Sequence, residues 1–158
     1  MFPVAAGATS LEDVRIGLRV LDYVISPADD RKAIGVIFDP RIKESVDDTL
    51  AIVDWVSSSA GHGGWTVSPV EMQKLSDAKG LKAVIIANGM ASHYDRVAAY
   101  GRETGTVVIS SDLVCVRSAK CTVGIATAPR VEVVVSFEEA HSSGIQFSEA
   151  FRMMVTEY

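Results

Sequence analysis

Cysteine and histidine are scarce in this chain of 158 residues, which contains two cysteines and three histidines. A structural zinc site needs four ligands, usually in closely spaced pairs, so this chain could build one only by bringing distant loops together. A thioredoxin-type redox motif has two residues between its cysteines, whereas five residues separate Cys115 from Cys121. The zinc-binding and redox classes are therefore disfavoured, and no metal or cofactor is expected.

Long apolar runs and basic runs are also missing. No stretch approaches the roughly 20 apolar residues that a membrane-spanning helix needs. The 15 lysines and arginines are scattered along a chain of net charge −5. Nucleic-acid binding is not expected, because it would require a clustered basic surface. The G-x-S-x-G elbow of α/β-hydrolases is absent as well, and no catalytic residue is assigned.

Apolar residues are plentiful, at 48% of the chain, and they fall into alternating strands and helices. Apolar runs at 33–38, 82–87 and 106–110 are typical of strands that are covered on both faces. A weaker strand is expected at 65–70, where Pro69 suits the edge of a sheet. The alternation predicts a single α/β domain with a central, mostly parallel sheet flanked by helices.

Helices are expected where apolar side chains recur every three or four residues. The first should run from residue 11 to residue 25, and a second should bury a face that includes Val46, Leu50 and Val53. Four Ser-x-x-Asp/Glu motifs beside helical segments are interpreted as capping boxes or close variants. They are Ser10/Asp13, Ser45/Asp48, Ser92/Asp95 and Ser136/Glu139.

The last third of the chain has a different pattern. Two strand-like segments, 121–128 and 131–136, are separated by a short turn and predict an antiparallel C-terminal hairpin. A short helix that ends at Gly144 should follow. The segment 145–158 is then expected to place apolar side chains along one helical face. That face comprises Phe147, Phe151, Met154 and Val155.

Polar side chains gather where the expected strands end. Ligands of open α/β sheets bind at the carboxyl ends of the strands, which locates a candidate binding site. Its residues are Asp39, Asn88, His93, Ser110, Ser111 and Asp112. They offer hydrogen-bond donors and acceptors but no strong nucleophile, so the pattern favours binding over turnover. His93 itself, near the start of a helix, is expected to face solvent.

The segment VISSDLVCVRSAKCTVGIA, residues 108–126, contains both cysteines in apolar, strand-like surroundings. The spacing alone leaves two interpretations open. Two buried thiols would behave as small hydrophobic side chains in a reducing compartment. A disulfide would close a short loop and would persist in an oxidising compartment.

Four features follow one another along the chain: a strand ending in VISSD, the segment CVRSAKC, a strand pair, and a tail of the form A-x-x-x-G-[LIV]-x-[IF]-S-x-x-[LF]. The tail positions are Ala140, Gly144, Ile145, Phe147, Ser148 and Phe151. This arrangement resembles the YfiR-like family of small periplasmic proteins. The layout matches over roughly residues 10–156 and is most specific over 106–155. The chain departs from the family where the usual strand end F-x-I-N reads VVVS, at 133–136.

The resemblance implies a disulfide between Cys115 and Cys121, a periplasmic location and a homodimer. In the best-known system, a family member inhibits a membrane-bound diguanylate cyclase by binding its periplasmic sensor domain. The implied function is therefore non-enzymatic: binding and inhibition of a membrane-bound signalling partner, tuned by a small ligand or by redox state.

Residues 1–9 are expected to be disordered or to be the remnant of a signal peptide, since they lack the basic and apolar regions of a complete signal. The YfiR-like domain should span 10–158. Two other functions remain as alternatives. One is a small solute-binding component of a transporter, although such proteins usually have two lobes. The weaker one is a cytosolic hydrolase-type enzyme that uses Ser110 or Asp112 with a histidine.

Overall fold

The computed structural model describes residues 9–25, 31–58 and 64–157, which form a seven-stranded sheet with helices on both faces. The expected N-terminal segment 1–9 lies, apart from Thr9, outside the described residues. The strand order is β2-β1-β3-β4-β5-β6-β7. The strands are β1 (Ala33–Phe38), β2 (Thr66–Glu71), β3 (Leu81–Ile86), β4 (Val107–Ser110), β5 (Val123–Ala126), β6 (Glu132–Val135) and β7 (Thr156–Glu157).

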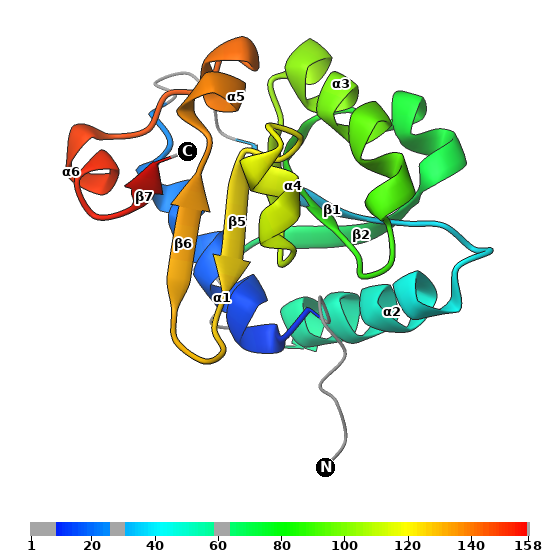
Figure 1. The fold of residues 1–158 in the computed structure, drawn as a ribbon. Helices are drawn as coiled ribbons and strands as arrows, with labels where there is room; N and C mark the ends of the chain where they lie inside the picture. The colour runs from blue at the N-terminus through cyan, green and yellow to red at the C-terminus, as the bar shows by residue number, and fades with distance from the viewer. Residues whose placement is uncertain (1–8, 26–30, 59–63, 158) are drawn as a thin grey trace.

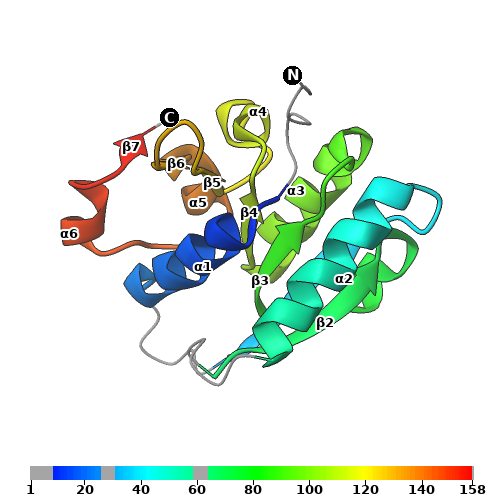
Figure 2. The same ribbon diagram turned by 90° about the horizontal axis from the view of Figure 1, so that it is seen from below.

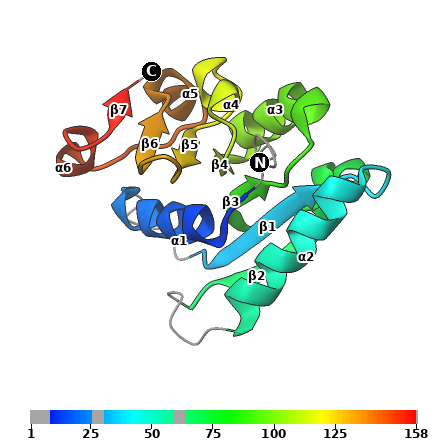
Figure 3. The same cartoon turned by 60° about the horizontal axis from the view of Figure 1, so that its bottom comes forward.

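Neighbouring strands run parallel except β5 and β6, which form an antiparallel hairpin (Figure 1). Two helices, α1 (Leu11–Val20) and α2 (Lys43–Ser58), cover one face of the sheet. Three others, α3 (Tyr94–Thr104), α4 (Leu113–Arg117) and α5 (Phe137–Ser142), cover the opposite face (Figure 2 and Figure 3). The predicted fold class, a mostly parallel α/β sheet with a C-terminal hairpin, is confirmed.

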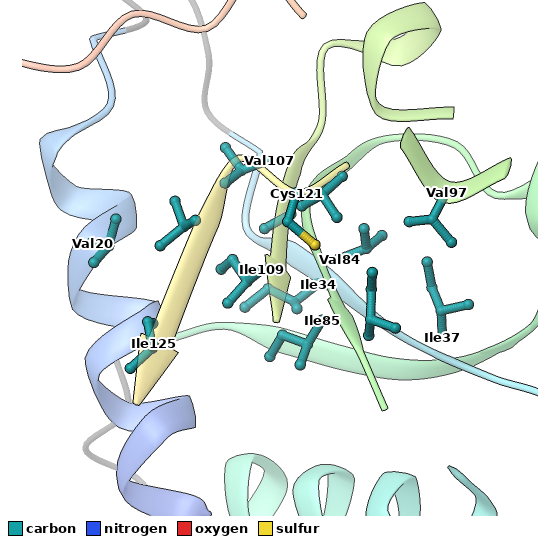
Figure 4. Packing of buried hydrophobic residues seen from close by; sticks show 14 of the residues in the cluster. Val20, Ile34, Ile37, Val84, Ile85, Val97, Val107, Ile109, Cys121 and Ile125 are labelled. Atoms are coloured by element: carbon teal, nitrogen blue, oxygen red, sulfur yellow. The ribbon is translucent and has the colours of Figure 1, made fainter. Parts of the chain in front are cut away.

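The central strands form the core because helices exclude water from both of their faces. Ile34 and Ile37 of β1 and Val84 and Ile85 of β3 are each no more than 3% exposed, and they interlock with side chains of β4 and β5 (Figure 4). Burial on both sides explains why these strands read as continuous apolar runs. The expected strand at 33–38 matches the bounds of β1, and β3 lies one residue earlier than expected.

Two helices differ from their expected form. The first ends at Val20 and continues as a 3₁₀ turn over Leu21–Tyr23 instead of reaching residue 25. The buried face of α2 comprises Ser45, Thr49, Ile52 and Val56. Leu50, expected to be inward, is 65% exposed. The apolar pattern was misleading because two polar side chains occupy buried positions, and the Ser45 hydroxyl is satisfied there by backbone carbonyls.

Half of the capping predictions are confirmed. The hydroxyls of Ser10 and Ser136 each accept a hydrogen bond from the backbone N–H three residues later. The predictions at Ser45 and Ser92 are wrong, because Ser45 lies inside α2 and Ser92 lies in the 3₁₀ turn Ala91–His93 that precedes α3. The motif alone cannot distinguish a cap from a serine one turn away from it.

The final segment is not the expected helix. It forms the single turn α6 (Glu149–Arg152) and the short strand β7, which pairs in parallel with β6. Phe147 and Phe151 are buried as expected, whereas Met154 is 65% exposed. Phe147 is positioned by an antiparallel bridge to Val24, which follows the first helix. Contacts with the distant N-terminal segment therefore replace the helical contacts that the periodicity suggested.

Candidate functional site

A cleft opens at the carboxyl ends of β3 and β4. The strand order places β1 between β2 and β3, so the connections leaving β1 and β3 run to opposite sides of the sheet. Such a switch in strand order leaves a crevice at the carboxyl ends of the two strands that it separates, here β1 and β3. The cleft lies on the β3 side of this switch point, with residues that follow β3 and β4 in its lining. The cleft has a volume of about 340 Å³. Its lining comprises Thr9, Glu44, Ile86, Ala87, Asn88, Gly89, Ala91, Tyr94, Ser110, Ser111 and Asp112.

Four of the six predicted site residues line this cleft. Asn88 follows β3, Ser110 ends β4, and Ser111 and Asp112 come directly after it. The buried strands place these residues at one edge of the sheet, as their positions after apolar runs predicted. The other two predicted residues, Asp39 and His93, lie outside the lining and bond to each other instead.

Asn88 joins the end of β3 to helix α2. Its backbone N–H donates to Asp48 Oδ2 at 2.8 Å, and its side-chain Nδ2 donates to Glu44 Oε2 at 3.0 Å. The turn continues through Gly89, whose φ of +85° is a conformation that glycine adopts without strain. The loop after β3 is thus held against the first turns of α2, and Asn88 of the loop and Glu44 of the helix both line the cleft.

Asp112 joins the end of β4 to helices α3 and α4. Its Oδ1 accepts the backbone N–H of Val114 at 3.0 Å and so caps α4, while its Oδ2 accepts the hydroxyl of Tyr94 at 2.8 Å. Its own N–H donates to Ser110 Oγ at 3.0 Å. In the enzymatic alternative Asp112 would orient a histidine, but its side-chain contacts here are with Tyr94 and with the start of α4.

Burial controls the protonation of two groups at the cleft. Desolvation, reinforced by the Asp112 carboxylate, raises the pKa of Tyr94, so this hydroxyl stays neutral and donates a hydrogen bond to Asp112. Desolvation also raises the pKa of Asp48, which lies behind the backbone of Asn88, and the like charge of Asp13 adds to that shift. The hydrogen bond from Asn88 opposes the shift of Asp48 by favouring the carboxylate.

A separate cluster closes the end of β1. The Asp39 side chain is 2% exposed and accepts the guanidinium of Arg41 at 3.0 and 3.1 Å and the ring of His93 at 2.9 Å. Hydrogen bonds from the Arg41 side chain are the main reason why the pKa of Asp39 lies well below its usual range. The expectation that His93 faces solvent is wrong, because its side chain is 15% exposed.

A disulfide joins Cys115 to Cys121, with 5.3 Å between their Cα atoms, as the family resemblance implied. Both side chains are fully buried. The surroundings of Cys115 are helical, in α4, although the sequence looked strand-like there. The bond ties α4, which Asp112 caps, to the residue that leads into β5. Gly124 in β5 makes this packing close, since a Cβ at that position would lie 2.6 Å from Val116 Cγ1.

Among the lining or supporting residues that were not assigned to the site from the sequence, three make side-chain hydrogen bonds to predicted site residues. Glu44 reaches the cleft from the first turn of α2, and Asp48 was interpreted as part of a capping box, although it accepts the N–H of Asn88. Tyr94 reaches the cleft from the first residue of α3 and bonds to Asp112. No local motif marks these side chains, because they meet Asn88 and Asp112 through the packing of helices over the strand ends.

The comparisons with known proteins bear on the fold. No protein-family model matches the sequence, and no curated protein matches it. A conserved domain protein from Vibrio cholerae is similar in structure, with a TM-score of 0.68 and 14% identity over 93% of this chain and 59% of its own. The ABC domain from Streptococcus pneumoniae, solved in complex with L-Trp, has a TM-score of 0.68 and 10% identity over 92% of this chain and 60% of its own.

These likenesses show a shared fold. The chain spans about three-fifths of the length of each of these two structures. Within residues 9–25, 31–58 and 64–157, no group of three or more acidic, histidine or cysteine side chains is placed to hold a metal ion. None of the helices formed by those residues has the length and apolar character needed to cross a membrane.

Proposed function

We propose that this chain is a periplasmic, non-enzymatic regulatory protein of the YfiR-like type. It binds a small polar ligand in the strand-end cleft, and occupancy of the cleft changes its binding to a membrane-bound signalling partner such as a diguanylate cyclase. The sequence resemblance supports the partner class, and the buried disulfide supports an oxidising compartment, where such bonds persist.

The observation that carries this proposal is the double role of Asp112. The same carboxylate lines the cleft and caps α4, and it also holds Tyr94 of α3. A ligand that bonds to Asp112 would therefore act on a carboxylate that holds both helices. We propose that the resulting change at the N-terminus of α4 alters side chains on its outer surface, while the disulfide holds Cys115 in place. Val114 is one of these and is 64% exposed.

Calorimetric titration tests the proposed partner class. The oxidised protein is titrated with the purified periplasmic sensor domain of each membrane-bound diguanylate cyclase encoded in the same genome. Saturable binding to at least one domain is expected, together with loss of cyclase activity when the full-length enzyme is reconstituted with this protein. Absence of binding to every such domain would refute the proposed partner class. The homodimer that the resemblance implies is measured on the same sample by sedimentation equilibrium.

A solute-binding component of a transporter is the second candidate. The structural neighbour solved with L-Trp favours it, because that protein shares the fold and binds a small polar molecule. Under this candidate, the liganded protein should bind the periplasmic face of a permease and should not affect any cyclase. The two functions thus predict different partners for the same cleft.

A further inference from the structure

Three carboxylates near the strand ends but outside the cleft lining are ion-paired: Asp39 with Arg41, Asp47 with Lys43 at 2.7 Å, and Asp95 with Lys120 at 2.7 Å. These pairs satisfy the negative charges within the protein. The carboxylates that line the cleft have partners of a different kind.

The two carboxylates in the cleft lining have neutral hydrogen-bond donors as partners. Glu44 accepts the amide of Asn88, and Asp112 accepts the hydroxyl of Tyr94 and the N–H of Val114. The described lining contains no lysine, arginine or histidine. Glu44 comes from α2 on one face of the sheet, and Asp112 precedes α4 on the other face. Two negative charges thus border one cavity from opposite sides, and no basic side chain of the described lining offsets them.

Two further features match a positively charged guest. Desolvation and the charge of Asp13 raise the pKa of Asp48, so a cation in the cleft would relieve an unfavourable negative charge behind Asn88. Tyr94 also lines the cavity, and it is an aromatic residue whose hydroxyl is bound to Asp112. Aromatic rings attract cations electrostatically.

We propose that the cleft binds a small organic cation, whose protonated amine is held between Glu44 and Asp112. This inference rests on the proposed function, since it names the ligand class of the same cleft. The hydroxyls of Ser110 and Ser111 and the ring of Tyr94 contact the uncharged part of the guest. Ser110 is 3% exposed, so its position is fixed before any ligand arrives. The volume of about 340 Å³ suits a molecule the size of an arylalkylamine.

Three probes of similar shape test the charge preference. They are 2-phenylethylamine, a cation, 2-phenylethanol, which is neutral, and 3-phenylpropionate, an anion. Each is titrated at neutral pH and low salt into the ¹⁵N-labelled, oxidised protein while amide chemical shifts are recorded. The amine should shift the amides of Asn88, Gly89 and Ser111, with an affinity at least about tenfold above that of the alcohol. The anion should bind more weakly than either.

Charge-removing variants locate the interaction. Glu44→Gln keeps an acceptor for Asn88, and Asp112→Asn keeps a residue that caps helices well. Each should lower the affinity for the amine about tenfold and should lower the affinity for the alcohol by a clearly smaller factor. Asp47→Asn is the matched control: it removes a charge from the same helix, but its partner is Lys43 outside the cleft. This variant should bind the amine like the unmodified protein.

The outcomes separate the two proposals. Equal or tighter binding of the alcohol or the anion at the cleft would overturn the preference for a cation and leave the cleft as a binding site. Amine affinity that falls equally in Asp47→Asn would also overturn it, because the effect would then be one of net charge. If none of the three probes shifts the cleft amides, the proposed binding site fails, and the cation proposal fails with it.

Discussion

Removal of the disulfide has a cost that can be worked out from its position. The bond closes a loop in which its two ends are six residues apart. In the loop-closure model, opening such a ring gives the unfolded chain an entropy worth about 2.4 kcal/mol at 25 °C. Reduction of the unmodified protein should therefore lower the free energy of unfolding by about that amount. In a domain of this size, the melting temperature should fall by roughly 5–10 °C.

Urea unfolding with and without reductant measures this effect. The double variant Cys115→Ala/Cys121→Ala should lose at least as much stability, because both sulfur atoms are fully buried and their contacts disappear too. Reductant must leave that variant unchanged. A difference below about 0.5 kcal/mol between oxidised and reduced protein would refute the loop-closure reasoning. Hydrogen exchange should also show that the amides of α4 are the first to lose protection on reduction.

Three substitutions test other parts of the account. Burial raises the pKa of Asp48 above 3.8, so Asp48→Asn should stabilise the protein at pH 7, and urea unfolding should show this gain disappearing below pH 3.8. The pKa of Asp39 is lowered from 3.8, so its ionised side chain stabilises the folded protein at neutral pH, and this stabilisation is lost in acid. Asp39→Asn should therefore destabilise the protein at neutral pH and flatten the decline of its melting temperature below pH 3.8. Gly124→Ala should cost about 1–3 kcal/mol in urea unfolding through its clash with Val116, and Val116→Ala in the same chain should recover part of that cost. An additive result for the last pair would contradict the proposed contact.

The strands could be predicted because strands that are buried on both faces consist of continuous apolar residues. The bounds of β1 and β3 follow from AIGVIF and KAVIIA to within one residue. Elements that depend on distant partners could not be predicted in this way. In α2, Ser45 faces inward because its hydroxyl donates to the carbonyl of Asp39, directly after β1, and to that of Ile42 in the turn before the helix. Helix α4 was missed because LVCVR has β-like composition and is held as a helix by a cap and a disulfide.

The candidate site was predicted in part for the same reason. Asn88, Ser110 and Asp112 follow buried strands, so the sheet brings them together. Glu44 and Tyr94 reach the cleft from helices that lie above the strand ends, and only the packed structure places them there. The separation of Asp39 from the cleft also depends on tertiary contacts, since Arg41 and His93 occupy its carboxylate.

The proposed function depends on ligand binding in the cleft at the ends of β3 and β4. Amide chemical shifts test it most directly when the oxidised, ¹⁵N-labelled protein is exposed to periplasmic small-molecule extract and to pure amines. We expect saturable shifts at the amides of Asn88, Gly89, Ser111 and Asp112. Shifts confined to the hollow beside Phe137 and Arg152, with these four amides unmoved, would contradict it.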